Sequence, residues 1–157
     1  MDKELLIHDD IINKLDNFIK TNKIPNIIFY GPSGCGKHKI LFDFINKIYN
    51  HDKENIKKNV MFLNCTHSKG IKYIREDLKF FLKSIINIDN GKFFKSIILS
   101  NADKLTADAQ SALRRCIEVF NHNTRFFIVI EDKSKLLKPI LSRFSEIFIN
   151  YPIINNN

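Results

Sequence analysis

Gly31-Pro-Ser-Gly-Cys-Gly-Lys37 is the stretch of this sequence that decides its fold. An apolar run at 26–30 precedes it and an amphipathic run at 39–49 follows it, which predicts a strand, a glycine-rich turn and a helix in that order. The glycines let the backbone approach phosphate oxygens, and the helix offers its positive N-terminal end. The pattern therefore predicts a nucleotide-binding P-loop. Its predicted contact residues are Gly31, Pro32, Ser33, Gly34, Cys35, Gly36, Lys37 and His38.

The residue after Lys37 departs from the motif. A P-loop normally has Ser or Thr there, whose hydroxyl ligates Mg²⁺, whereas this chain has His38. Magnesium prefers oxygen ligands, so an imidazole is a poor substitute. The sequence therefore indicates a loop that holds phosphate but handles magnesium badly, which is typical of a protein that does not hydrolyse its nucleotide.

The composition indicates one globular domain. The chain has 157 residues, of which 44% are hydrophobic, enough for a single core. No stretch approaches the roughly 20 apolar residues of a membrane span, and the N-terminus has no signal-peptide layout, so we expect an intracellular protein without membrane contact. The three cysteines and five histidines are not clustered, so neither disulfides nor a metal site is predicted. The net charge of +8 fits either a solvated surface or a polyanionic partner such as DNA.

Hydrophobic periodicity predicts alternating helices and strands. Helices are expected over about 11–19, 39–49, 71–86 and 106–120, with a short helical piece at 139–143 and a loop at 50–59. Strands are expected over 26–30, 60–63, 93–99, 125–130 and 147–149, and the strand at 60–63 is expected to be buried. This order predicts an α/β fold, a three-layer sandwich in which a five-stranded parallel sheet has helices on both faces. Ligands of such sheets bind at the carboxyl ends of the strands.

Several segments resemble the small subunits of replication factor C, the clamp loaders of the AAA+ P-loop NTPase class. Residues 96–115, which include Asp108-Ala-Gln-Ser-Ala-Leu-Arg-Arg115, resemble the Walker B strand and following helix of that family. Residues 124–144 resemble its sensor 1 strand and Ser-Arg-Cys motif, and Lys69-Gly-Ile-Lys-Tyr-Ile-Arg75 resembles its Arg-Gly-Ile segment. The resemblance covers about 5–152 in collinear order.

The resemblance implies an AAA+ nucleotide-binding core over residues 1–152 and a frayed tail at 153–157. The lid and collar domains of the family have no counterpart in this sequence. The family implies a pentamer that binds ATP at subunit interfaces, opens a ring-shaped sliding clamp and closes it on primed DNA. The implied partners are other clamp-loader subunits, the clamp and primed DNA, in the nucleus of a eukaryote or at the replication site of a virus.

The Walker B and sensor 1 positions depart from the family pattern. Active members end the Walker B strand in Asp-Glu, which serve magnesium and the attacking water; the positions here are Ser100 and Asn101. The sensor 1 position, usually Asn, aligns with Glu131, whose carboxylate would repel a γ-phosphate. A carboxamide cannot take a proton as a carboxylate can. The resemblance therefore implies that ATP is bound statically or not at all, without productive Mg²⁺ and without turnover.

Four basic residues occupy positions to which the family assigns roles. Arg143 aligns with the arginine that points at the γ-phosphate of a neighbouring subunit, which implies an arginine finger in trans; an ordinary surface arginine is the alternative. Lys69, Lys72 and Arg75 align with contacts to the DNA backbone, which require positive charge rather than sequence readout. A solvated helix face is an equally open interpretation of these three.

The predicted function is that of a clamp-loader small-subunit-like protein of DNA replication that is not an active ATPase by itself. Two other classes stay open. A scaffold or interaction module with a relic P-loop would have the same sequence pattern, because the same glycines define the turn. An active P-loop ATPase or nucleotide kinase is the third class, although the chain lacks the Leu-Ser-Gly-Gly signature of transporter ATPases.

Overall fold

The chain folds around a five-stranded parallel sheet. The computed structural model describes residues 8–66, 71–83 and 94–151. The strands lie in the order β2-β3-β4-β1-β5, and each pairs in parallel with its neighbours. Their bounds are β1 Ile27–Tyr30, β2 Val60–Asn64, β3 Lys95–Ser100, β4 Thr124–Ile130 and β5 Ser145–Phe148. The predicted α/β class and five-stranded parallel sheet are confirmed.

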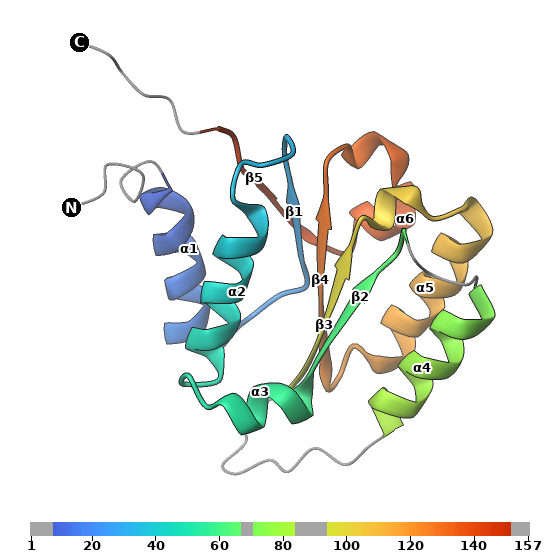
Figure 1. Ribbon diagram of the computed structural model, residues 1–157, viewed down its shortest axis with the longest axis horizontal. Helices are drawn as coiled ribbons and strands as arrows, with labels where there is room; N and C mark the ends of the chain where they lie inside the picture. The colour runs from blue at the N-terminus through green and yellow to red at the C-terminus, as the bar shows by residue number, and fades with distance from the viewer. Residues whose placement is uncertain (1–7, 67–70, 84–93, 152–157) are drawn as a thin grey trace.

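Helices cover both faces of the sheet, which gives the predicted three layers (Figure 1). One face carries α1 Asp9–Lys20 and α2 Lys37–Ile48, with α3 Lys53–Asn59 below them. The other face carries α4 Ile71–Lys83, α5 Ala107–Phe120 and the short α6 Lys138–Leu141. Two single turns of 3₁₀ helix, η2 Ala102–Lys104 and η3 Lys133–Lys135, follow β3 and β4.

Alternate residues of the central strands enter two separate cores, because successive side chains of a strand point to opposite faces. In β1, Ile27 and Phe29 pack under α1 and α2, whereas Ile28 packs under α4 and α5. In β4, Phe127 joins the first core and Phe126 the second. All five are fully buried. Burying such a side chain contributes roughly 1.5–3 kcal/mol, so the two-sided burial of the strands is the main source of stability.

Three predicted elements differ in the structure. Residues 53–59 form helix α3 rather than a loop, because the Asp52 carboxylate accepts hydrogen bonds from the backbone N–H groups of Glu54 and Asn55 at its N-terminus. Strand β2, predicted to be buried, is an outermost strand of the described sheet, and Phe62 is 47% exposed. Strand β5 spans residues 145–148 rather than 147–149. The predicted ends at 84–86 and 93 lie outside the described residues.

The parallel register brings the carboxyl ends of three strands to one edge of the sheet. Tyr30 of β1 is the Cα partner of Ile130 in β4, and Ser100 of β3 is the partner of Val129. The loops that follow β1, β3 and β4 therefore leave the sheet side by side. The glycine-rich loop, the predicted Walker B positions Ser100 and Asn101, and the predicted sensor 1 residue Glu131 all lie at this edge.

Helix α5 allows a matched test of the second core. Leu113 is 2% exposed beneath this helix, whereas Val119 on the same helix is 62% exposed. We expect Leu113→Ala to lower the free energy of unfolding by about 2–5 kcal/mol, since it leaves a cavity between α5 and the sheet. Val119→Ala should change it by no more than about 0.5 kcal/mol. Urea denaturation of both variants measures the difference, and equal losses would contradict the burial of Leu113 between α5 and the sheet.

Candidate functional site

The loop between β1 and α2 has the backbone conformation that its glycines allow. Gly34 has φ 77° and Gly36 has φ 92°, both in the left-handed region that other residues rarely adopt. Gly36 is the N-cap of α2, and its carbonyl accepts the backbone N–H of Ile40 at 3.1 Å. The remaining N–H groups of the first turn face the loop, where the helix dipole is positive. This geometry suits an anionic phosphate group.

The segment after β5 packs directly against this loop. A Cβ atom on Gly31 would lie 1.9 Å from the carbonyl oxygen of Ile149, so only glycine fits there. The thiol of Cys35 donates a hydrogen bond to the same carbonyl at 3.3 Å. The hydroxyl of Tyr151 donates to the carbonyl of Ser33 at 2.6 Å. Residues more than 110 positions apart in the sequence thus hold the loop in shape.

Lys37 lies inside the loop that it follows. Its side chain is 7% exposed, and its ammonium group donates hydrogen bonds to the carbonyl oxygens of Gly31 and Pro32. These carbonyls satisfy the buried charge in this conformation. A phosphate group at the loop would be a stronger partner for the ammonium group, because hydrogen bonds between two charged groups are roughly twice as strong as neutral ones. The ammonium group of Lys37 therefore lies at the loop, and its role as a phosphate ligand stays a prediction from the sequence.

His38 and Ser100 form a direct contact. Nε2 of His38, on the first turn of α2, lies 3.0 Å from the hydroxyl oxygen of Ser100 at the end of β3. The rings of Phe42 and Phe62 flank the imidazole, with centroid distances of 6.3 and 6.4 Å. Burial, and to a lesser degree the charge of Lys37, lower the pKa of His38. The structure thus brings two of the positions that depart from the family pattern into one hydrogen-bonded contact.

Asn101 pairs with a residue that sequence reasoning missed. Its side-chain amide donates to the side-chain oxygen of Asn64, at the end of β2, at 3.1 Å. Asn101 has φ 59°, a left-handed conformation that asparagine tolerates better than most residues. A polar residue at the end of an apolar strand beside the Walker B strand was the available signal for Asn64. A carboxamide pair offers no carboxylate to activate water.

Two carboxylates near the same edge have different environments. Glu131, at the sensor 1 position, is exposed just beyond β4. Asp103 in η2 is 8% exposed, and its Oδ1 has no hydrogen-bond partner in the described part of the chain. Its charge contributes to the raised pKa of Cys65, about 11, whose main cause is burial. Neither carboxylate occupies the Walker B positions.

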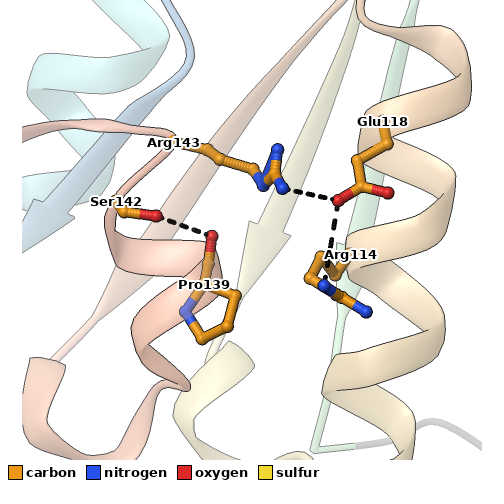
Figure 2. Close-up of polar contacts among 5 residues, drawn as sticks. All are labelled: Arg114, Glu118, Pro139, Ser142 and Arg143. Atoms are coloured by element: carbon orange, nitrogen blue, oxygen red, sulfur yellow. Dashed lines mark hydrogen bonds and ion pairs between the residues drawn. The ribbon is translucent and has the colours of Figure 1, made fainter.

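Arg143 is held against helix α5 (Figure 2). A terminal nitrogen of its guanidinium lies 2.7 Å from the carboxylate of Glu118, and Arg114 lies 3.9 Å from the same oxygen. The side chains of Arg143 and Glu118 are 44% and 39% exposed, so the pair is a surface contact worth about 0–1 kcal/mol. Such a contact orients Arg143 without preventing its exchange to a stronger anion.

The predicted DNA-contacting residues are only partly described. Lys69 and the side chain of Lys72 lie outside the described residues. Arg75 is exposed on α4 and lines a groove of about 460 Å³ between α4 and α5. The other cations of this groove are Lys79, Lys83 and Arg115. Arg75 therefore belongs to a basic surface to which α5 contributes Arg115.

In the described ranges, no group of three or more His, Cys, Asp or Glu side chains could hold a metal ion. Every described helix is also too short or too polar to cross a membrane.

Sequence comparison identifies relatives of the chain. It is 36% identical over 144 residues to the replication factor C small subunit of Saccharolobus solfataricus, a match that covers 92% of this chain and 42% of that protein. It is 38% identical over 141 residues to replication factor C subunit 3 of Schizosaccharomyces pombe, covering 90% of this chain and 40% of that protein. This chain is a homologue of the replication factor C small subunits. It spans less than half the length of these relatives.

Solved structures show the same fold. A DNA polymerase III gamma subunit-related protein of Thermotoga maritima matches with a TM-score of 0.69 at 17% identity, over 90% of this chain and 46% of that one. The Orc1 protein of Aeropyrum pernix matches with a TM-score of 0.64 at 13% identity, over 99% and 46% of the two chains. These neighbours establish the AAA+ P-loop NTPase fold for the replication factor C homologue. No protein-family model matches the sequence.

The contact between Gly31 and Ile149 predicts a graded response to alanine. In Gly36→Ala the new Cβ meets no non-adjacent residue within 4 Å in the described part of the chain, so the only cost is the strain of an alanine in a left-handed backbone conformation. We expect this variant to lower the free energy of unfolding by about 1–2 kcal/mol. Gly31→Ala must also displace the backbone carbonyl of Ile149, so we expect a loss of about 3 kcal/mol or more. Urea denaturation compares the variants. A Gly31→Ala protein as stable as Gly36→Ala would contradict the contact.

Proposed function

We propose that this replication factor C homologue serves a clamp loader in DNA replication as a small subunit that binds ATP without hydrolysing it. In this proposal it supplies Arg143 in trans to the nucleotide of a neighbouring subunit while a sliding clamp is loaded on primed DNA. Its partners are other clamp-loader subunits, the clamp and the DNA, wherever DNA is replicated. The homologues and the AAA+ fold support the general role.

One observation supports the proposed absence of ATP hydrolysis. The glycine loop and Lys37 have the geometry for phosphate, whereas His38 and Ser100, at the two positions that serve magnesium, are hydrogen-bonded to each other at 3.0 Å. His38 offers no oxygen to magnesium, and the Ser100 hydroxyl lacks the negative charge of the Walker B carboxylate. Asn101 stands in place of the general base, a loss that alone typically lowers rates by about 10²–10⁴. Binding and turnover therefore depend on different residues, and only those for binding are present.

The placement of Arg143 supports the role in trans. It follows α6 on the face of the sheet opposite to α2, where Glu118 orients its guanidinium at the surface (Figure 2). A permanently charged, planar group suits recognition of a phosphate. Arginine fingers of other NTPases contribute about 10³–10⁵ in rate.

In this proposal, basic side chains of α4 contact primed DNA. Arg75 is exposed there, beside the cations of the α4–α5 groove. Positive side chains along one surface suit a phosphate backbone, which needs no base readout. Lys69 and Lys72 remain candidates from the sequence.

Calorimetry of ATP binding tests the nucleotide site. We expect ATP to bind the wild-type chain, to bind Lys37→Ala at least tenfold more weakly because a charge-assisted contact of about 1.5–3 kcal/mol is lost, and to respond little to Mg²⁺. Lys39→Ala, an exposed lysine two positions further on, is the control and should bind as the wild type does. Strongly Mg²⁺-dependent binding would contradict the inference that His38 and Ser100 do not support productive Mg²⁺ binding.

The arginine finger is tested in the assembled loader. We expect Arg143→Ala to lower the ATPase rate of the assembly by about 10³ or more, since it removes a positive charge from the transition state of the neighbouring site. The same variant should leave ATP binding by this chain unchanged. Arg114→Ala, which removes the other arginine of the cluster, is the matched control and should have a small effect. An assembly that is equally active with Arg143→Ala would refute the role.

A scaffold module with a relic P-loop is the alternative, and it is favoured if no ATP binds. The internal bonds of Lys37 to Gly31 and Pro32 are the observation that supports it, because they satisfy the lysine without a ligand. An active ATPase or nucleotide kinase is not supported, since the described site lacks a carboxylate at either Walker B position.

A further inference from the structure

His38 and Ser100 have no task in the proposed function, yet the fold holds them beside the phosphate loop. His38 directly follows Lys37 on the first turn of α2, and its Nε2 lies 3.0 Å from the hydroxyl of Ser100. Phe42 of α2 and Phe62 of β2 flank the ring. The imidazole is therefore placed by contacts from three elements, α2, β2 and β3, rather than being a mobile surface group.

A bound polyphosphate needs more positive charge than the loop supplies. A nucleoside triphosphate carries several negative charges, which P-loop proteins offset with a lysine and with Mg²⁺. Among the described residues, Lys37 is the one cation buried at this loop. Without productive magnesium, a second cation would have to come from the protein, and His38 is the titratable group adjacent to the lysine.

Serine at position 100 allows the imidazole to exist in both charge states. A hydroxyl can donate to the unprotonated nitrogen of a neutral imidazole, and it can accept from the N–H of an imidazolium. The contact between His38 and Ser100 can therefore persist when the ring takes up a proton. A carboxylate at the same position would favour the imidazolium even without a ligand, because an opposite charge favours the charged form.

The surroundings disfavour the protonated ring in the free site. Burial lowers the pKa of His38, and the charge of Lys37 lowers it further. Phe62 and Ser100, which face the ring from β2 and β3, carry no charge. A polyphosphate bound beside Lys37 reverses this balance, since an anion within about 4–6 Å favours the protonated ring.

We propose that His38 takes up one solvent proton when a nucleoside polyphosphate binds, and that the imidazolium supplies the positive charge that Mg²⁺ supplies in other P-loop proteins. The proton goes to the ring nitrogen that is unprotonated in the neutral tautomer, and no covalent bond of the ligand changes. The ligand of this site is then a metal-free nucleoside polyphosphate. The inference rests on the nucleotide binding proposed above, and it identifies His38 as the group that offsets part of the negative charge of the polyphosphate.

The pH dependence of ATP affinity follows from the proposed rise in the pKa of His38 when ATP binds. Protonation is linked to binding, so ATP affinity falls by up to about tenfold for each pH unit between the pKa of His38 in the free site and its higher pKa in the bound site. Below the lower pKa the ring is charged in both states, and above the higher pKa it is neutral in both. The affinity gain is therefore complete at low pH and lost as the pH rises through this window.

NMR of the imidazole signals tests the proposal directly. The whole chain is titrated from pH 5 to 8.5 with and without saturating ATP, in EDTA, and His38→Gln identifies the signal. We expect ATP to raise the pKa of His38 by at least about one unit. His51→Gln, which removes an exposed histidine on the turn after α2, is the matched control. In His38→Gln the ATP affinity should follow only the titration of ATP itself, which is common to all variants.

Ser100→Asp provides a second, independent readout. The new carboxylate should hold His38 protonated before ATP is added, so its pKa should rise in the free protein and ATP binding should lose the dependence on pH. If ATP binding requires Lys37 but leaves the pKa of His38 unchanged, the nucleotide site stands and the proton uptake is wrong. If ATP does not bind, or binds equally to Lys37→Ala, the proposed nucleotide site itself is wrong.

Discussion

Both faces of the parallel sheet are apolar, and covering both of them is the constraint on which the rest of the structure depends. Alternate side chains of β1 and β4 enter two cores, so helices must pack on either side of the sheet. Because helices join the parallel strands, every strand runs in the same direction, and the carboxyl ends of all strands lie at the same edge of the sheet. The phosphate loop, Ser100 and Glu131 meet at that edge because the sheet is parallel, although up to 100 positions separate them in the sequence.

The site divides into a backbone part and a side-chain part. The loop depends on glycine conformations, on the first turn of α2 and on the contact of Gly31 with Ile149, all of which belong to the fold itself. Magnesium binding and water activation depend on single side chains that point into solvent or toward each other. Residues such as Ser100 and Asn101 can therefore stand at the predicted Walker B positions without disturbing the sheet or the backbone of the glycine-rich loop.

Most of the sheet could be predicted from the sequence because its strands are short apolar runs between helical periodicities. The prediction failed where the local pattern was polar or where burial depended on a neighbour. Helix α3 has few apolar residues, and the cap formed by Asp52 was the signal that was overlooked. Strand β2 is as apolar as a central strand, but in the described sheet it pairs only with β3, so Phe62 is half-exposed.

The sequence by itself determined the phosphate loop, the strand and helix order, and the replacement of oxygen and carboxylate groups by His38, Ser100 and Asn101. These are properties of residue type and spacing, which are read along the chain. Only the tertiary structure decided that His38 contacts Ser100, that Asn64 joins Asn101 and that Glu118 orients Arg143. Such contacts link residues 25 to 62 positions apart, and they arise from strand order and helix packing, which no local pattern contains.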